Sequence, residues 1–259
     1  GDDYEKAIGR TISKIDDLQQ LLYATGGHSL LVILQAMDAA GKDSAIRHVF
    51  SGINPQGCEV HSFKQPSAEE LAHDFLWRTY ERLPGRGRIG VFNRSYYEEV
   101  LVVRVHPEIL EKQGLPPDVA AGKHIWKERY ESIANMEKHL ARNGTTVVKI
   151  FLHVSREEQK KRLISRIDDE AKNWKFSEAD LAERACWKKY MKAYEDCMEA
   201  TSTKHAPWYV VPADDKKNAH LIVAEIVRDA LKSMKMKYPK TDEARVAALK
   251  KIREELAAD

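Results

Sequence analysis

The chain has 259 residues, of which 43% are hydrophobic and 32% are charged, and its formal net charge is only +2. This composition is typical of a globular domain and lacks the overall basicity of a nucleic-acid binder, so any polyanion site must be local. An α/β chain of this length often forms one domain, and we expect a single domain with an insertion.

Simple counts exclude further classes of protein. No apolar run approaches the ~18 residues that span a bilayer, and the acidic start GDDYE is unlike a signal peptide. We therefore expect a cytoplasmic protein that binds neither membrane nor nucleic acid. Three cysteines without C-x-x-C spacing predict neither a disulfide framework nor a zinc site.

The first predicted element is an amphipathic helix over residues 4–24. Its apolar positions lie three or four residues apart, which places them on one face of a helix. These positions are Ile8, Ile12, Ile15, Leu18 and Leu22. We assign this helix a packing role.

Residues 30–50, LLVILQAMDAAGKDSAIRHVF, predict a strand, a loop of small residues and a helix. Small residues let backbone N–H groups converge on a phosphate at the helix N-terminus, where the helix dipole favours negative charge. Lys42 adds a formal positive charge at that point. The small residues just before it are Ala39, Ala40 and Gly41.

The loop departs twice from the nucleotide-binding pattern G-x-x-x-x-G-K-[ST], with Ala36 at the first Gly and Asp43 at the Ser or Thr. Asp38 and Asp43 thus place two carboxylates where a polyanion would bind. A divalent cation would turn that repulsion into attraction, and Mg²⁺ is the natural candidate, with Mn²⁺ as an alternative. A tight strand-to-helix turn with two solvated aspartates is the structural alternative.

Further strands are predicted at 59–63, 89–92, 147–154 and 208–211, and helical patterns alternate with them. A helix from Ser67 to Leu83 is predicted by the capping-box spacing of its first residues. Strands that alternate with helices indicate a parallel α/β sheet, whose ligand site lies at the carboxyl ends of the strands.

Residues 156–192 contain 11 Lys or Arg against 8 Asp or Glu. We interpret this segment as a mobile basic flap; the alternative is a solvated helical surface with i,i+4 ion pairs. A final helix is predicted over 242–257, with Val246, Leu249, Ile252 and Leu256 on one stripe, and it would dock on the body or on a second subunit.

The strand at 89–92 is followed by Asn93-Arg94-Ser95-Tyr96-Tyr97-Glu98-Glu99, which would direct Arg94 toward the phosphate loop to neutralise a transferring phosphoryl group. Five separated blocks, QAMDAAGKD, FKQPS, VFNRSYYEEV, NWKFS and APWYVVPADDK, together closely resemble the polyphosphate kinase 2 family. They recur in family order and cover nearly the whole chain.

This resemblance implies a P-loop kinase-like fold, similar to that of thymidylate kinases, with a parallel sheet flanked by helices and a helical lid at about 156–192. It also implies Mg²⁺-dependent, reversible phosphoryl transfer between inorganic polyphosphate and nucleotides. The implied catalytic residues are Asp38, Lys42, Arg94 and Glu98, and the implied metal ligands are Asp38, Asp43 and Glu98. The implied polyphosphate- and nucleotide-binding residues are Ala39, Ala40, Gly41, Lys42, Asp43, Lys64, Arg94, Arg104, Lys161, Arg162, Arg166 and Lys175.

Two positions bear on the details of that resemblance. The family often has Asp where this chain has Asn93, which offers a metal only a neutral oxygen. Glu98 and the continuation EEVLVVRVHPE resemble the sequence of the subgroup that accepts nucleoside mono- and diphosphates. The expected acceptors are therefore AMP and ADP, together with GMP and GDP. ATP is an expected product. A surface glutamate is the alternative for Glu98. A homo-oligomer, dimer or tetramer, is expected.

Direct in-line transfer needs mainly positioning and charge stabilisation, so no histidine nucleophile is expected, although His61, His73, His124 and His153 could in principle form a phosphohistidine. Two rival functions are an ATP-dependent nucleotide or small-molecule kinase and a non-catalytic polyanion-binding module. Tyr96, Tyr97, Trp77 and Trp174 are candidate base or lid contacts, although aromatic residues more often lie in a core.

Overall fold

A five-stranded parallel sheet forms the centre of the protein. The computed structural model describes residues 2–258, without the side chains of Asp2 and Lys175. Strand order is β2-β3-β1-β4-β5, and every pair is parallel. The strands are β1 (Ser29–Ala36), β2 (Cys58–Ser62), β3 (Ile89–Asn93), β4 (Thr145–His153) and β5 (Trp208–Pro212). The predicted α/β class is confirmed.

Strand β1 lies between β3 and β4, and its register positions the two loops of interest. Leu34 pairs with Asn93 of β3 and with Ile150 of β4. The chain therefore leaves β1 and β3 at the same edge of the sheet, side by side. Ligands of open α/β sheets bind at this edge, beyond the carboxyl ends of the strands.

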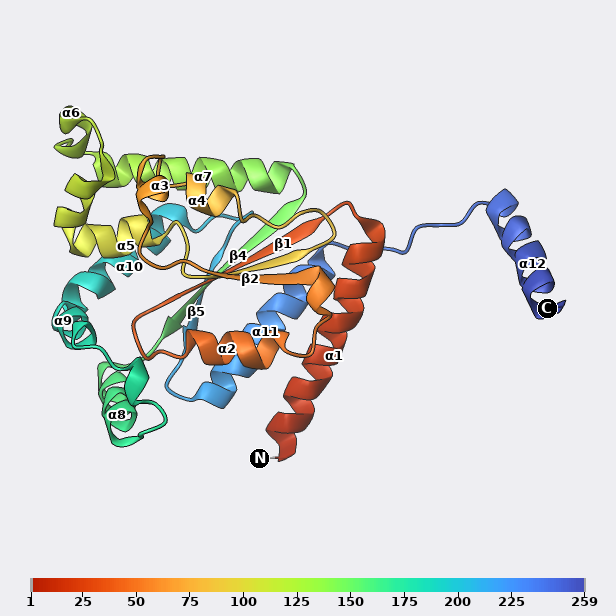
Figure 1. Ribbon diagram of the computed structural model, residues 1–259, viewed down its shortest axis with the longest axis horizontal. Helices are drawn as coiled ribbons and strands as arrows, with labels where there is room; N and C mark the ends of the chain where they lie inside the picture. The colour runs from red at the N-terminus through yellow and green to blue at the C-terminus, as the bar shows by residue number, and fades with distance from the viewer. Residues whose placement is uncertain (1, 259) are drawn as a thin grey trace.

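Helices cover both faces of the sheet (Figure 1). One face carries α1, α2 and α11, and the other carries α5, α7 and α10. The helices are α1 (Asp2–Thr25), α2 (Lys42–Phe50), α3 (Ala68–Leu71), α4 (Trp77–Tyr80), α5 (Glu98–Val105), α6 (Pro117–Ala120), α7 (Ile125–Arg142), α8 (Arg156–Asp168), α9 (Ala179–Ala185), α10 (Trp187–Thr201), α11 (Lys216–Ser233) and α12 (Glu243–Ala258). Three 3₁₀ turns occur among the described residues: η1 (Pro55–Gly57), η2 (Pro107–Gln113) and η3 (Asn173–Lys175).

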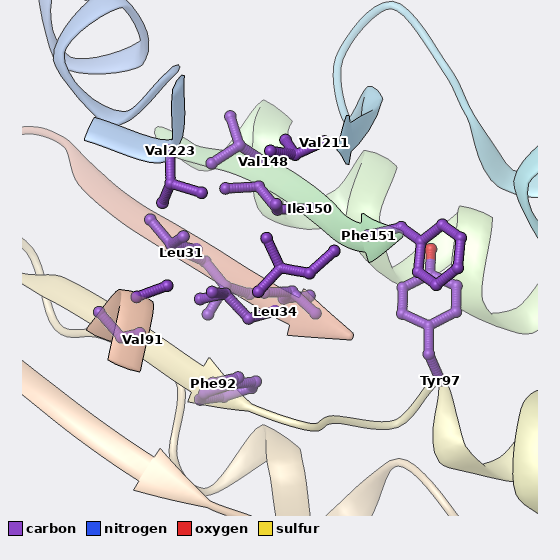
Figure 2. Packing of buried hydrophobic residues seen from close by; sticks show 14 of the residues in the cluster. Leu31, Leu34, Val91, Phe92, Tyr97, Val148, Ile150, Phe151, Val211 and Val223 are labelled. Carbon is purple, nitrogen blue, oxygen red and sulfur yellow. The ribbon is translucent and has the colours of Figure 1, made fainter. Parts of the chain in front are cut away.

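The core lies on both sides of the central strands. Every residue of β1 from Leu30 to Leu34 is fully buried, as expected for a strand covered on both faces. Figure 2 shows Val223 of α11 facing Leu31 and Val148 of the sheet. Tyr96 and Tyr97 are also fully buried, so these two aromatic residues belong to the core and not to the candidate base contacts.

The predicted helix from Ser67 to Leu83 is wrong. The capping box forms as expected, with Ser67 and Glu70 exchanging hydrogen bonds, but α3 ends at Leu71. The side chain of Asp74 then accepts a hydrogen bond from the backbone N–H of Leu76 and begins a new turn that leads into α4. The capping box correctly marked the beginning of α3, and a separate turn at Asp74 stands where the helix was predicted to continue.

The two ends of the chain differ in their contacts. Helix α1 spans the residues predicted for it and packs along α11. Helix α12 stands away from the body (Figure 1), and Val246, Leu249, Ile252 and Leu256 are exposed on it. Between residues 2 and 258, the structure contains no helix with the length and apolar character that a membrane span requires.

Candidate active site

The loop between β1 and α2 has the conformation of an anion-binding turn. Its backbone has positive φ angles at Ala39 (61°) and Gly41 (108°), and a value near 108° favours glycine. Gly41 caps α2 without a side-chain hydrogen bond. Because the first N–H groups of a helix have no intrahelical acceptor, those of α2 are available to an anion at this point.

Lys42 begins α2 and directs its ammonium back across the loop. Its Nζ donates to the carbonyl oxygen of Ala36 over 3.0 Å. Burial lowers the pKa of Lys42, and the nearby Arg94 guanidinium lowers it further, against the opposing effect of the surrounding carboxylates. A phosphate bound at the loop would add negative charge next to Lys42 and so stabilise its charged form.

Arg94 follows β3 in a left-handed conformation, with φ of 66°, which costs a non-glycine residue about 1 kcal/mol or more. Its backbone N–H donates to Leu34 O over 3.0 Å, which joins the ends of β1 and β3. Its guanidinium bridges two carboxylates, Asp38 and Glu98, each at 3.3 Å. Burial disfavours the charge on Arg94, but Glu98 and Asp38 outweigh it and raise its pKa.

The three predicted metal ligands do not gather at one point. Asp38 and Glu98 lie on either side of Arg94, while Asp43 accepts a hydrogen bond from Asn93 Nδ2 over 2.7 Å. Over the described residues, no group of three or more His, Cys, Asp or Glu side chains is arranged to hold a metal ion. A cation bound here would have to take most of its ligands from substrate or water.

Most of the predicted binding residues line one cavity of about 980 Å³. Among the described residues, nine basic and three acidic side chains line it, a local excess of six positive charges in a chain whose net charge is +2. The charged lining residues are Asp38, Lys42, Asp43, Arg47, Lys64, Arg94, Glu158, Lys161, Arg162, Arg166, Lys172 and Lys216. Ala39, Ala40 and Gly41 complete the floor. Such a concentration of charge fits a polyanion.

Arg162, a predicted phosphate ligand on α8, makes a different set of contacts. It is 9% exposed, and its guanidinium donates to the carbonyl oxygens of Ala39, Ala40, Ala213 and Asp214 at 2.6–3.1 Å. The neighbouring Gln159 donates to Asp38 O over 2.9 Å. Helix α8 is therefore anchored to the loop between β1 and α2, and Arg162 fixes the backbone of that loop.

Two predicted site residues lie elsewhere. Arg104 does not line the cavity, because its guanidinium donates to Tyr130 and Asp196 on α7 and α10. Glu98 lies behind Arg94 and is also outside the lining. The side chain of Lys175 lies outside what the structure describes.

Several lining residues were not predicted. They are Ser44, Arg47, Ser62, Phe63, Gln65, Glu158, Ser165, Lys172 and Lys216. Arg47 could have been found from its position one helical turn beyond Asp43, on the same face of α2. Lys216 is the last residue of the block APWYVVPADDK and the first residue of α11, but only the topology brings it to the phosphate loop.

The histidines considered as nucleophiles lie away from the cavity. His61, His73, His124 and His153 are all absent from its lining in the described part of the chain. His73 stacks on Trp77, with ring centroids 4.0 Å apart. This arrangement agrees with transfer that does not pass through a phosphohistidine.

Comparison with known proteins points to one family. The family described as "Polyphosphate kinase 2 (PPK2)" matches residues 1–239. The chain is 58% identical over 253 residues to an ADP-polyphosphate phosphotransferase of Rhodopseudomonas palustris, a match that covers 98% of this chain and 88% of the relative. It is 45% identical over 231 residues to an AMP/ADP-polyphosphate phosphotransferase of Meiothermus ruber, covering 89% and 82% of the two chains.

Solved structures agree with the sequence comparisons. The crystal structure of polyphosphate kinase 2 from Arthrobacter aurescens TC1 is similar, with a TM-score of 0.88 and 42% identity. The match covers 97% of this chain and 86% of that chain.

Proposed function

Because the chain belongs to the polyphosphate kinase 2 family, we propose that it is an enzyme that transfers phosphoryl groups between inorganic polyphosphate and AMP or ADP. One observation in the structure carries this proposal. Lys42, Arg94 and the α8 cations converge on one cavity of about 980 Å³, whose charged side chains are mostly basic. A large basic cavity suits a polyanion as donor.

The phosphate loop supplies the chemistry that phosphoryl transfer needs. Such transfer depends mainly on positioning and on stabilising the charge of the transferring group. Lys42 and the free N–H groups of α2 would hold a phosphate of the donor, while Arg94 reaches toward the same space from the end of β3. Transfer from donor to acceptor would then be direct and in line, without a covalent enzyme intermediate.

The donor set of the loop fits Mg²⁺. This ion commonly takes one or two carboxylates from the protein and completes its octahedron with phosphate oxygens and water. Asp38 and Asp43 on the phosphate loop provide such carboxylates, whereas Asn93 is engaged with Asp43. Bound Mg²⁺ would neutralise negative charge on the phosphates, and Mn²⁺ could take its place.

Cations on α8 would complete the donor site. Lys161, Ser165 and Arg166 face the cavity from that helix, opposite the phosphate loop. A phosphate chain between the two sides would displace water from the reacting groups, which limits hydrolysis. The segment 156–192 would thus serve as a lid that is hinged on the Arg162 anchor.

The acceptor is the finer part of the proposal. One relative is named for ADP alone and another for AMP and ADP. Glu98 beside Arg94 favours the broader choice, because a carboxylate there can help to position a short acceptor. GMP and GDP are expected to react as well.

A product assay tests the proposal. Purified protein is incubated with polyphosphate and Mg²⁺, with ATP absent at the start, and separately with AMP, ADP, GMP and GDP. We expect ADP and ATP to form from AMP, and chelation of the metal to stop the reaction. Activity with ATP but not polyphosphate would favour the ATP-dependent kinase. Salt-sensitive polyphosphate binding without any change of nucleotide would favour the non-catalytic module.

The expected homo-oligomer belongs to the same proposal. Exposed apolar side chains on α12 support an assembly in which this helix is covered. Light scattering on the purified chain, with and without residues 240–259, measures the subunit number, and a monomer in both cases would contradict the expectation.

A further inference from the structure

Gln35 is a fully buried amide at the end of β1, just before the phosphate loop. The five residues before it, Leu30 to Leu34, are all apolar and buried. A buried amide costs free energy unless its donor and acceptor groups are satisfied, so its partners show why it is tolerated here. Both partners come from the turn after β3.

The orientation of this amide is fixed from two sides. Ser95 Oγ donates to Gln35 Oε1 over 3.2 Å, and Ser95 Oγ itself accepts from the backbone N–H of Tyr97 over 3.1 Å. Gln35 Nε2 then donates to Glu98 Oε1 over 2.6 Å. An amide turned the other way would place its oxygen against the carboxylate, an acceptor facing an acceptor. The side chain therefore has one arrangement.

Each carboxylate oxygen of Glu98 thus has its own donor. Oε1 accepts from Gln35, which is inaccessible to solvent, and Oε2 accepts from Arg94 at 3.3 Å. Arg94 is 41% exposed and shares its guanidinium with Asp38. When Arg94 turns to a phosphate, Gln35 is the partner that keeps Glu98 in place.

We propose that Gln35 is a positioning residue that holds the Glu98 carboxylate against Arg94, which lines the cavity, and thereby sets the preference between nucleoside mono- and diphosphates. This inference rests on the proposed function. The nucleoside of a monophosphate must approach the reacting centre one phosphate closer than that of a diphosphate. The position of Arg94, which Glu98 fixes from behind, consequently matters more for the monophosphate.

The test replaces the amide while keeping its size. In Gln35→Met, Glu98 loses a charge-assisted hydrogen bond, and we expect kcat/KM with AMP to fall about tenfold. With ADP we expect less than about a threefold loss, and an unchanged KM for polyphosphate, because Lys42 and the loop are intact. A general structural defect would lower kcat/KM with both acceptors and raise the KM for polyphosphate, and that outcome would overturn the proposal. An unchanged ratio of AMP to ADP activity would overturn it as well.

A double-mutant cycle links the effect to Glu98. If Gln35 acts through that carboxylate, adding Gln35→Met to Glu98→Gln lowers AMP activity no further. Independent, additive losses would contradict the proposal. Ser95→Ala removes only one hydroxyl, and it should shift the same ratio less strongly; it serves as the test if Gln35→Met does not fold.

The control is a second buried amide far from the site. Gln19 on α1 is 1% exposed and its Oε1 has no hydrogen-bond partner among the described residues, so Gln19→Leu removes a buried amide from another part of the core without touching the Gln35 network. We expect the AMP to ADP ratio of this variant to equal that of the unmodified protein. Assays of the unmodified protein distinguish a failure of this proposal from a failure of the proposed function. If the unmodified protein phosphorylates neither AMP nor ADP, the proposed function itself is refuted.

Discussion

Two lysines, the fully buried Lys149 and the half-buried Lys42, show how the same residue type serves structure in one region and chemistry in another. Lys149, in the middle of β4, is fully buried and donates to Glu137, Tyr97 Oη and Thr201 O at 2.6, 2.9 and 2.8 Å. Lys42, at the start of α2, donates to one acceptor within the described part of the chain, Ala36 O. An ammonium has three N–H groups, so all three donors of Lys149 have an acceptor, whereas Lys42 has an acceptor for one.

The surroundings of each lysine extend this difference. Around Lys149, Tyr96 and Tyr97 both donate to Glu137, which forms a closed polar cluster beneath the turn that carries Arg94 and Glu98. Around Lys42, the side chains face an open cavity. A completed buried cluster fixes the backbone of the site, while an incomplete one leaves donors for a ligand.

The largest effect is expected from a substitution that breaks the closed cluster around Lys149. Lys149→Met leaves the buried Glu137 with only hydroxyl donors, and we expect a loss of about 3–5 kcal/mol in the free energy of unfolding. Replacing both partners, in Lys149→Met with Glu137→Leu, should restore most of that loss, because no unpaired buried charge is left. Urea denaturation measures both. Equal stability of the single and double variants would show that the pair does not act as a unit.

The next effect concerns turnover. Lys42→Ala removes a donor that stabilises the transferring group, and we expect kcat to fall about 10²-fold or more, equivalent to about 2.7 kcal/mol. Stability should change little, because burial already disfavours this ammonium and lowers its pKa. Lys232→Ala, which removes the same charge from the exposed last turn of α11, is the matched control. Near-normal turnover of Lys42→Ala would contradict the comparison.

A third prediction assigns Arg162 to the structural side of the comparison. Arg162→Lys keeps the charge but cannot donate to four carbonyl oxygens at once, since an ammonium lacks the planar fork of a guanidinium. We expect a loss of about 2 kcal/mol in the free energy of unfolding. Thermal unfolding with and without polyphosphate measures the effect. An unchanged stability together with a raised KM for polyphosphate would indicate that Arg162 binds phosphate directly.

The sheet and the phosphate loop could be predicted because their signals are local. Strands such as 89–92 and 208–211 are short apolar runs between polar segments, and the structure places β3 and β5 within one residue of them. Gly41 and Lys42 identify the loop from their own chemistry. Alternation of strands and helices then suffices to predict where Arg94 meets that loop.

The partners of the charged residues could not be predicted, since they depend on tertiary packing. Arg162 and Lys161 are adjacent in a basic segment, yet one is buried against backbone carbonyls and the other is 77% exposed. Likewise, nothing local in EEVLVVRVHPE indicates that Arg104 pairs with Asp196, 92 positions away. Composition predicts how much charge a segment has, but not where each charge points.

A smaller effect is expected from Glu98→Asn, which tests the preference between AMP and ADP within the site. Glu98→Asn shortens the side chain and removes the carboxylate that Gln35 and Arg94 hold. We expect kcat/KM with AMP to fall about tenfold, with a smaller loss for ADP, as for removal of one charged hydrogen-bond partner. Initial rates at varied AMP and ADP measure the ratio. Equal losses on both acceptors would leave Glu98 without a selective role.

The smallest effect is expected for Lys161, which represents the open side of the cavity. Its ammonium is exposed and lies only within 4.0 Å of Glu158, so it contributes to polyphosphate binding by long-range attraction. Lys161→Ala should raise the KM for polyphosphate about two- to threefold at low salt, without a change in kcat. Because exposed charges are screened, the difference should vanish as ionic strength rises, whereas that of Lys42→Ala should persist. A salt-independent loss for Lys161→Ala would instead indicate direct contact with phosphate in a closed site.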